Sequence, residues 1–139
     1  MARRRRKIAR IFLSHSAKDR TFVVKLTEFL RRQKVNYWYS AHHIAGADQW
    51  HDEIGRALQR CDWFLVVLSP NSVRSTWVKR ELLYALQNES YSGRIIPLYF
   101  KRCDYAKLSW TLSSFQFVQF DMDFDSGCRQ LVKALGKRR

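Results

Sequence analysis

Residues 63–83, WFLVVLSPNSVRSTWVKRELL, form the stretch that decides the fold of this chain. Its first six residues are apolar, which is typical of a strand covered on both faces in a parallel sheet. Val78 and Leu82 then lead to Ala85 at the spacing of a buried helical stripe. The stretch therefore predicts a buried strand followed by a helix over about residues 75–88, which is the repeating unit of α/β folds.

The expected helix carries a carboxylate and an indole on one face. Trp77 and Glu81 are four residues apart, so they lie side by side on a helix. This helix starts where the strands end, and open α/β sheets bind ligands at that edge. An acid beside an aromatic surface suits chemistry on a flat, cationic ring. The plainer alternative is that Trp77 belongs to the core and Glu81 is a solvated charge.

Strands and helices alternate along the rest of the chain. Because such alternation produces right-handed crossovers, it predicts a parallel sheet with helices on both faces. Five strands fit a flavodoxin-like, three-layer α/β sandwich with the strand order 2-1-3-4-5. Pro97 is tolerated in the fourth strand near an edge or a bulge. The expected strands are 8–14, 35–39, 63–68, 95–100 and 115–120.

The spacing of apolar residues also predicts three helices besides the one that carries Glu81. Ser16 and Asp19 are candidate N-caps of the first helix, and Asp48 is the candidate cap of the second. Gly136 suits the position just after the last helix. The segment 101–114 shows no clear period. The residues expected to face the core are Phe22, Val23, Leu26, Phe29 and Leu30, then Trp50, Ile54, Ala57, Leu58 and Cys61, and finally Cys128, Leu131, Val132 and Leu135.

Composition indicates one globular domain in a reducing compartment. The chain has 139 residues, enough to bury a core without disulfide bonds. Its net charge is +14, but nine basic residues lie in residues 1–10 and 137–139, where there is no acid. Such charge runs are usually solvated, so nucleic acid is not the expected partner. Cys61, Cys103 and Cys128 do not suit a disulfide framework or a zinc site. We therefore expect a cytoplasmic protein that holds no metal.

Three common occupants of this fold are excluded by the chemistry they need. A phosphate-accepting receiver needs clustered acids after the first strand and an aspartate after the third, where this chain has LSHS at 13–16 and Ser69. A nucleotide-binding fold needs a glycine-rich loop, and no glycine precedes Gly46. A serine hydrolase needs a Gly-x-Ser-x-Gly elbow, which the sequence lacks.

Five groups of residues carry a further signal: IFLSHSAKD at 11–19, WYS at 38–40 with IAG at 44–46, Trp50 with Ile54, Ala57 and Leu58, FLVVLS at 64–69, and STWVKREL at 75–82. Each group alone is weak, but their order and spacing are specific. Together they closely resemble the Toll/interleukin receptor (TIR) domain family, from about Ile8 to Leu135. The intact pair of Trp77 and Glu81 is similar to the bacterial and plant-type enzymatic branch.

The resemblance implies that Glu81 cleaves NAD+, releasing nicotinamide and leaving ADP-ribose or a cyclic isomer. NAD+ is then the substrate, and no cofactor is expected. The chemistry agrees with a single carboxylate, because nicotinamide leaves as a neutral ring. Most glycosidases need a second acid to protonate the leaving group. A fixed anion at Glu81 stabilises the oxocarbenium-like ribose.

Seven residues near the same edge of the sheet are expected to contact NAD+. Two are tryptophans, whose faces suit the bases or the ribose. Three form the turn after the first strand, where backbone amides face the diphosphate. Two are serines that end the first and third strands. In this order they are Trp50 and Trp77, His15, Ser16 and Ala17, and Ser14 and Ser69.

The resemblance also implies assembly with other TIR domains. The expected domain covers 8–136, between basic tails at 1–7 and 137–139. The connection 40–49 is long for its kind, and in the family it docks against a neighbouring domain. Self-association would then activate the enzyme in immune, antiphage or cell-death-type signalling, beside a fused or separate sensor domain. The alternative is a non-catalytic TIR module that assembles signalling partners.

Overall fold

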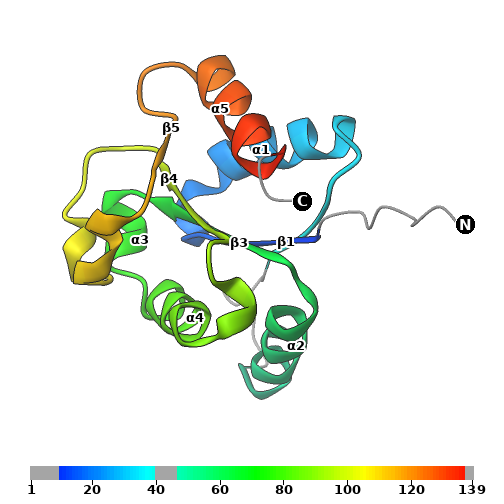
Figure 1. Ribbon diagram of the computed structural model, residues 1–139. Coiled ribbons are helices and arrows are strands. Elements are labelled where there is room, and N and C mark those ends of the chain that lie inside the picture. Colours follow the sequence, from blue (N-terminus) through cyan, green and yellow to red (C-terminus); the bar gives the residue numbers. More distant parts are fainter. Residues whose placement is uncertain (1–9, 40–46, 137–139) are drawn as a thin grey trace, which may run out of the picture.

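A five-stranded sheet between two layers of helices makes up the computed structural model, which describes residues 10–39 and 47–136 (Figure 1). The strands are β1 (Arg10–Ser14), β2 (Asn36–Trp38), β3 (Trp63–Leu68), β4 (Ile95–Tyr99) and β5 (Val118–Gln119). The α-helices are α1 (Arg20–Arg32), α2 (Ala47–Arg60), α3 (Pro70–Val73), α4 (Thr76–Gln87) and α5 (Phe124–Gly136). The short 3-10 helices are η1 (Ala17–Asp19), η2 (Glu89–Tyr91), η3 (Tyr105–Lys107) and η4 (Trp110–Ser114).

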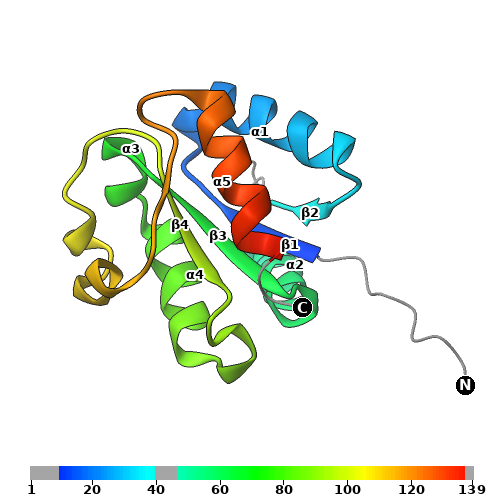
Figure 2. The ribbon, with the colours of Figure 1, turned by 45° about the horizontal axis from the view of Figure 1, so that its top comes forward.

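The sheet is parallel throughout, with the strand order β2-β1-β3-β4-β5. This order confirms the predicted flavodoxin-like fold. Figure 2 shows β1, β3 and β4 side by side behind α1 and α5. The register sets Ser14 beside Val66, so the end of β1 lies next to β3 shortly before β3 itself ends. The turns that follow β1 and β3 therefore start from the same edge of the sheet.

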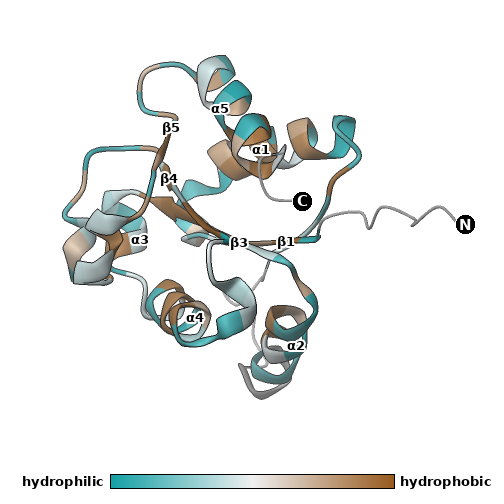
Figure 3. Ribbon diagram, viewed as in Figure 1, coloured by the Kyte–Doolittle hydropathy of each residue, from teal (hydrophilic) through white to brown (hydrophobic). Residues whose placement is uncertain are grey.

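Helices α1 and α5 cover one face of the sheet, and α2 and α4 cover the other (Figure 1). Because side chains alternate along a strand, Ile11 and Leu13 join the core cluster under α1 and α5, while Phe12 joins the cluster under α2 and α4. Every residue of β3 is buried, and its ribbon is brown in Figure 3. Burial on both faces explains the unbroken apolar run of this strand.

Most of the predicted core stripes are confirmed. On α4, Val78 and Leu82 are both 0% exposed. On α5, Cys128 and Leu131 are buried, but Val132 is 44% exposed. Val132 is a correction to the prediction: it follows Leu131 directly, and neighbours along a helix turn to different sides.

Several boundaries differ from those predicted. Helix α2 begins at Ala47, ahead of its predicted cap Asp48, so the connection before it is shorter than expected. Helix α5 includes Gly136, which was expected just beyond its end. The segment 101–114 contains η3 and η4, and β5 has two residues rather than the predicted stretch 115–120. Short 3-10 turns leave no long period in a sequence, which explains why the first of these segments gave no signal.

Pro97 lies in β4, which is an interior strand and not the edge strand that a proline favours. The backbone N–H of Phe100 donates to the carbonyl of Leu68 in β3. Because backbone groups alternate in direction along a strand, Pro97 turns its nitrogen away from β3, toward β5. The ladder between β4 and β5 starts after Pro97. The missing N–H therefore removes no hydrogen bond from the ladder between β3 and β4.

Candidate functional site

Glu81 lies on the second turn of α4, beneath the carboxyl edge of the sheet. The Ser75 side chain caps α4 by accepting a hydrogen bond from the backbone N–H of Val78 at 3.2 Å. This cap fixes where the helix begins, and with it the side of the helix that Glu81 occupies. Glu81 is 2% exposed. The alternative that it is a solvated surface charge is therefore wrong.

A hydroxyl group from β1 meets the Glu81 carboxylate. Ser14 donates a hydrogen bond from Oγ to Glu81 Oε1 at 2.7 Å, and the two residues are 67 positions apart in the sequence. Ser14 is 1% exposed, so the bond lies out of water. A buried carboxyl group is costly unless it is hydrogen-bonded, and a donated hydrogen bond favours the ionised form. The fold thus holds a carboxylate in a defined orientation at the edge where ligands of this architecture bind.

Trp77 stands one helical turn before Glu81 and is half-buried. Its side chain packs against the core cluster under α2 and α4. The guanidinium carbon of the exposed Arg80 lies 5.6 Å from the centre of its ring. The indole therefore lies partly in the core and partly at the surface, with the Arg80 guanidinium near its ring.

A second buried carboxylate, that of Asp19, lies at the same edge and was not predicted as part of any site. Asp19 is 4% exposed. Ser69 donates from Oγ to Asp19 Oδ2 at 2.5 Å. Asn71 donates from Nδ2 to Asp19 Oδ1 at 2.9 Å. Asp19 thus ties η1 to the end of β3 and to α3.

Ser69 begins α3 with a capping box. Its Oγ accepts from the backbone N–H of Ser72 at 3.0 Å, and Ser72 Oγ lies 2.9 Å from the backbone nitrogen of Ser69. Ser69 is 0% exposed, and its hydroxyl also binds Asp19. The structure therefore places this predicted NAD+ contact beneath the surface, where its side chain holds the fold.

Asp19 illustrates what local patterns miss. It occupies the predicted N-cap position of α1, yet its side chain makes no cap hydrogen bond there. Its partners lie 50 and 52 positions away in the sequence. The one available signal was the polar sequence after β3, which the predicted topology brings to the same edge as the turn after β1.

The turn after β1 brings three predicted binding residues together. His15 is 6% exposed, and its ring meets that of Tyr39 edge-on with centroids 5.3 Å apart. Ser16 caps η1, because its Oγ accepts from the backbone N–H of Lys18 at 3.2 Å. Ala17 starts η1 and is partly exposed. The expected cap at Ser16 is confirmed for η1, which precedes α1.

One predicted contact, Trp50, has a described backbone only. The backbone of Trp50 belongs to the first turns of α2, but its side chain is not described. The segment 40–46, which includes Gly46, is also outside the described part of the chain.

The charge of Asp19 affects the thiol pKa of Cys103, which follows β4. Burial raises the pKa of the Cys103 thiol to about 11, and the charges of Asp104 and Asp19 add to that effect. Cys61 and Cys128 also have thiol pKa values raised to about 11, mainly by burial. All three side chains are therefore neutral thiols at physiological pH.

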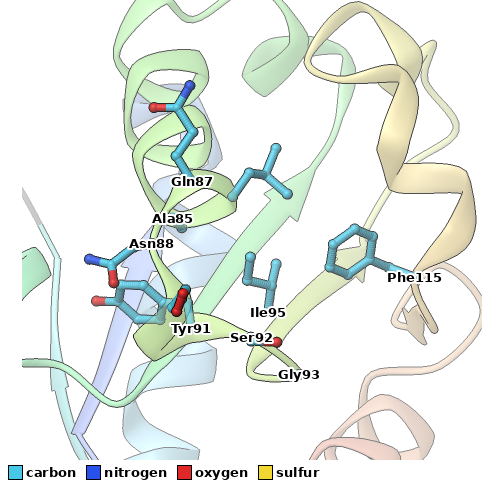
Figure 4. A pocket seen from close by; sticks show the side chains of 10 residues that line it. Ala85, Gln87, Asn88, Tyr91, Ser92, Gly93, Ile95 and Phe115 are labelled. Carbon is cyan, nitrogen blue, oxygen red and sulfur yellow. The ribbon is translucent and has the colours of Figure 1, made fainter.

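Two neighbouring hollows lie near the start of β4, at the opposite edge of the sheet from Glu81. The first, of about 300 Å³, is bounded by the end of α4, η2 and Phe115; Figure 4 shows Asn88, Tyr91 and Ile95 along its wall. The second, of about 480 Å³, shares Ile95 and Phe115 and extends to Lys133 on α5. Neither hollow includes a residue predicted to bind NAD+.

The described residues hold no group of three or more His, Cys, Asp or Glu side chains that could bind a metal ion. Among the same residues, no helix is both long and apolar enough to cross a membrane.

Comparison with known proteins adds a family match. A family model described as TIR domain matches residues 11–132. The chain is 27% identical to the 2' cyclic ADP-D-ribose synthase BtTIR of Bacteroides thetaiotaomicron over 92 residues, which cover 65% of this chain and 32% of that protein. It is 29% identical to the NAD(+) hydrolase TcpC of Escherichia coli over 91 residues, which cover 63% of this chain and 30% of that protein. The matched part thus spans about a third of the length of these curated relatives.

Solved structures share the fold at low sequence identity. The TIR domain of the Toll-related receptor TRR-2 from Hydra magnipapillata is 19% identical, with a TM-score of 0.73; the match covers 91% of this chain and 97% of that domain. The TIR domains of the activated Roq1 resistosome are 16% identical, with a TM-score of 0.68; the match covers 91% of this chain and 99% of that one.

Proposed function

The chain belongs to the TIR domain family, and from that premise we propose that it is an NAD+ glycohydrolase, which cleaves the bond between nicotinamide and ribose. Its products are nicotinamide and either ADP-ribose or a cyclic isomer. The observation that carries the proposal is the carboxylate of Glu81, buried and hydrogen-bonded to Ser14 at the ligand edge of the sheet. Relatives named as 2' cyclic ADP-D-ribose synthases and as an NAD(+) hydrolase support it.

Glu81 is the proposed catalytic residue. When the bond to ribose breaks, nicotinamide takes the bonding electrons and leaves as a neutral ring, so no general acid is required. The ribose develops positive charge as the bond lengthens, and a fixed carboxylate stabilises that charge. Water, or a hydroxyl group of the substrate itself, then attacks the anomeric carbon. Loss of the attacking group's proton gives linear or cyclic ADP-ribose.

The proposed substrate contacts surround Glu81. The exposed part of Trp77 supplies an aromatic surface beside Arg80, which suits a base or the ribose. The turn formed by His15, Ser16 and Ala17 starts a helix, and backbone N–H groups at such turns favour an anionic diphosphate. Trp50 is the second proposed aromatic contact, from the start of α2.

Assembly is the second part of the proposal. The segment 40–49 leaves the ligand edge of the sheet after β2, and we propose that it contacts a second TIR domain. A head-to-tail contact of this kind continues into an array unless it closes into a ring. The net charge of +14 opposes self-association at low concentration. The proposed setting is immune or cell-death-type signalling in the cytoplasm, which suits three free thiols.

The decisive experiment is incubation of the purified chain with NAD+ over about a hundredfold range of protein concentration, with chromatographic separation of the products. We expect nicotinamide and a form of ADP-ribose, and a specific activity that rises with protein concentration. Gly46→Pro is expected to flatten that rise, because proline restricts the backbone of the contact segment.

Glu81→Gln serves as the inactive variant and Glu28→Gln as its charge-matched control. Glu28 is an exposed residue of α1, on the opposite face of the sheet. Cleavage that is retained by Glu81→Gln would refute the catalytic assignment. A chain that cleaves no NAD+ at any concentration would favour the non-catalytic scaffold. A constant specific activity from a chain that stays monomeric would exclude activation by assembly.

A further inference from the structure

We propose that Ser14 is a positioning residue, which holds the Glu81 carboxylate ionised and in one rotamer and does not itself bind substrate. This inference rests on the proposed role of Glu81 in NAD+ cleavage. It also changes the sequence-based expectation, which placed Ser14 among the NAD+ contacts.

Ser14 lies at the end of β1, on the face of the sheet that α4 covers. Phe12 belongs to the core cluster on the face that α4 covers, and side chains two positions apart on a strand share a face. Ser14 therefore points toward α4, where its Oγ reaches Glu81 Oε1 at 2.7 Å. β1 pairs with β2 on one side and with β3 on the other. The donor thus sits on a strand that is fixed from both sides.

Both residues of this hydrogen bond are buried. Ser14 is 1% exposed and Glu81 is 2% exposed. The single hydroxyl proton of Ser14 is donated to Glu81 Oε1, so Ser14 acts on a neighbouring buried acid and has no proton left to donate to a substrate. Donation from a hydroxyl group stabilises the ionised carboxylate and disfavours the protonated one. The same bond restricts the rotation of the Glu81 side chain, which preorganises the charge for the developing oxocarbenium.

Other charged groups near α4 are less well placed to take this role. On or beside the elements that pack against α4, the described charged or titratable groups are Arg10 on β1, His15 just after β1, Asp62 just before β3, Arg74 between α3 and α4, and Glu89 and Tyr91 on η2. On α4 itself they are Lys79, Arg80 and Tyr84, and the first turns of α2, on the same face of the sheet, carry the exposed His51, Asp52 and Glu53. Of these, His15 and Tyr91 are buried. The Tyr91 hydroxyl donates to the backbone carbonyl of Leu58, and both residues remain unchanged in the variants below.

The test compares Ser14→Ala with the wild-type chain across pH, measuring kcat and KM for NAD+ separately. Loss of the donated hydrogen bond is expected to lower kcat at neutral pH roughly tenfold while KM changes little. Because the protonated form of Glu81 is no longer disfavoured, its pKa rises. The acid limb of the kcat profile should therefore move to higher pH, by about one unit. Ser14→Thr retains the hydroxyl group and should restore the profile.

The matched control is Thr27→Ala. Thr27 is a buried hydroxyl residue of α1 that donates to the carbonyl of Val24 at 3.0 Å and lies on the other face of the sheet. Its removal costs the hydrogen bond of a buried hydroxyl group without involving a carboxylate. We expect its acid limb to coincide with that of the wild-type chain. An equal shift of the acid limb in both variants would mean that loss of any buried hydroxyl group shifts the pH profile of kcat. That result would overturn the proposal.

A direct titration separates this inference from the proposed function. In protein labelled with carbon-13 at glutamate side chains, Glu81→Gln identifies the Glu81 carboxyl signal, and its titration is followed by NMR. The pKa of Glu81 should be higher in Ser14→Ala than in the wild-type chain, whether or not the chain cleaves NAD+. An unchanged Glu81 titration would overturn the role of Ser14. A raised pKa in a chain without NAD+ cleavage would support the role of Ser14 and count against the proposed function.

Discussion

Glu81 and Asp19 are both buried acids at one edge of the sheet, yet they are held in different ways. Asp19 accepts hydrogen bonds from Ser69 and Asn71, one at each carboxylate oxygen. Glu81 accepts a hydrogen bond from the hydroxyl group of Ser14. The partners of Asp19 belong to a capping network that starts α3, whereas Ser14 ends a strand. Burial alone therefore does not distinguish the proposed catalytic acid from an acid that holds the fold, whereas the other hydrogen bonds of their partners differ.

An amide substitution separates the two acids in principle. An amide has one acceptor oxygen and one donor group. At position 81, the oxygen still accepts from the Ser14 hydroxyl. At position 19, two donors face the side chain, so one of them meets an NH₂ group. The same chemical change thus keeps the bond from Ser14 at position 81 and disrupts one of the two bonds at position 19.

The largest effect is expected on turnover in Glu81→Gln. Loss of the fixed charge should reduce kcat for NAD+ by about 100-fold or more. The melting temperature should change little, because the amide keeps the hydrogen bond to Ser14. Paired measurements of kcat and thermal unfolding check this split. A variant that loses turnover because it unfolds would place Glu81 with Asp19 as a structural acid.

The next effect is on stability in Asp19→Asn. The two charge-assisted hydrogen bonds cannot both be kept, so the free energy of unfolding should fall by about 2 to 3 kcal/mol. Urea denaturation gives this value from the shift of the midpoint at a constant slope. Turnover per folded molecule is expected to fall far less than in Glu81→Gln. The contrast between the two acids breaks down if Asp19→Asn is as stable as the wild-type chain.

A smaller effect is expected from Trp77→Phe, which tests the surroundings of Glu81. Phenylalanine keeps an apolar ring for the core and loses part of the aromatic surface beside Arg80. We expect KM for NAD+ to rise a few-fold, consistent with about 1 kcal/mol for an aromatic contact, with little change in melting temperature. Steady-state kinetics and thermal unfolding of the same sample decide between the two roles. Equal losses of folding and activity would make Trp77 a core residue alone.

The smallest effect concerns Cys103, whose thiol pKa is raised in part by the charge of Asp19. Removing that charge in Asp19→Asn should lower the thiol pKa and speed alkylation of Cys103 near pH 9. Glu81→Gln should leave the rate unchanged. Peptide mass spectrometry also follows Cys61 as an internal control. The charge of Asp19 does not contribute to the raised thiol pKa of Cys61. Equal acceleration at both cysteines would indicate general opening of the fold rather than loss of one charge.

Local periodicity was sufficient to predict the sheet order and the buried stripe of α4. It failed along the segment between β4 and β5, because that segment is shaped by contacts among aromatic rings. Phe117 stacks on Tyr99 at 6.0 Å and meets Tyr105 edge-on at 5.0 Å. These contacts hold Phe117 in a loop, although its neighbours have the composition of a strand. Tertiary packing of this kind overrides strand propensity and leaves no local signal.

The candidate site was predictable only where its residues are close in the sequence. The spacing of Trp77 and Glu81 is local, so the sequence places both residues on α4. The hydrogen bonds from Ser14 to Glu81 and from Ser69 to Asp19 join positions that are distant in the sequence. Their residues were noticed, but the pairing between them depends on how β1, β3 and α4 meet in three dimensions.

The sheet ends in its two shortest strands, and this matters when many copies are crowded together. β2 has three residues and β5 has two. Edge strands expose backbone groups on which strands of other molecules can grow, and short edges leave little room for that growth. Short edge strands therefore disfavour pairing between the sheets of neighbouring copies, which is the first step of amyloid-like growth.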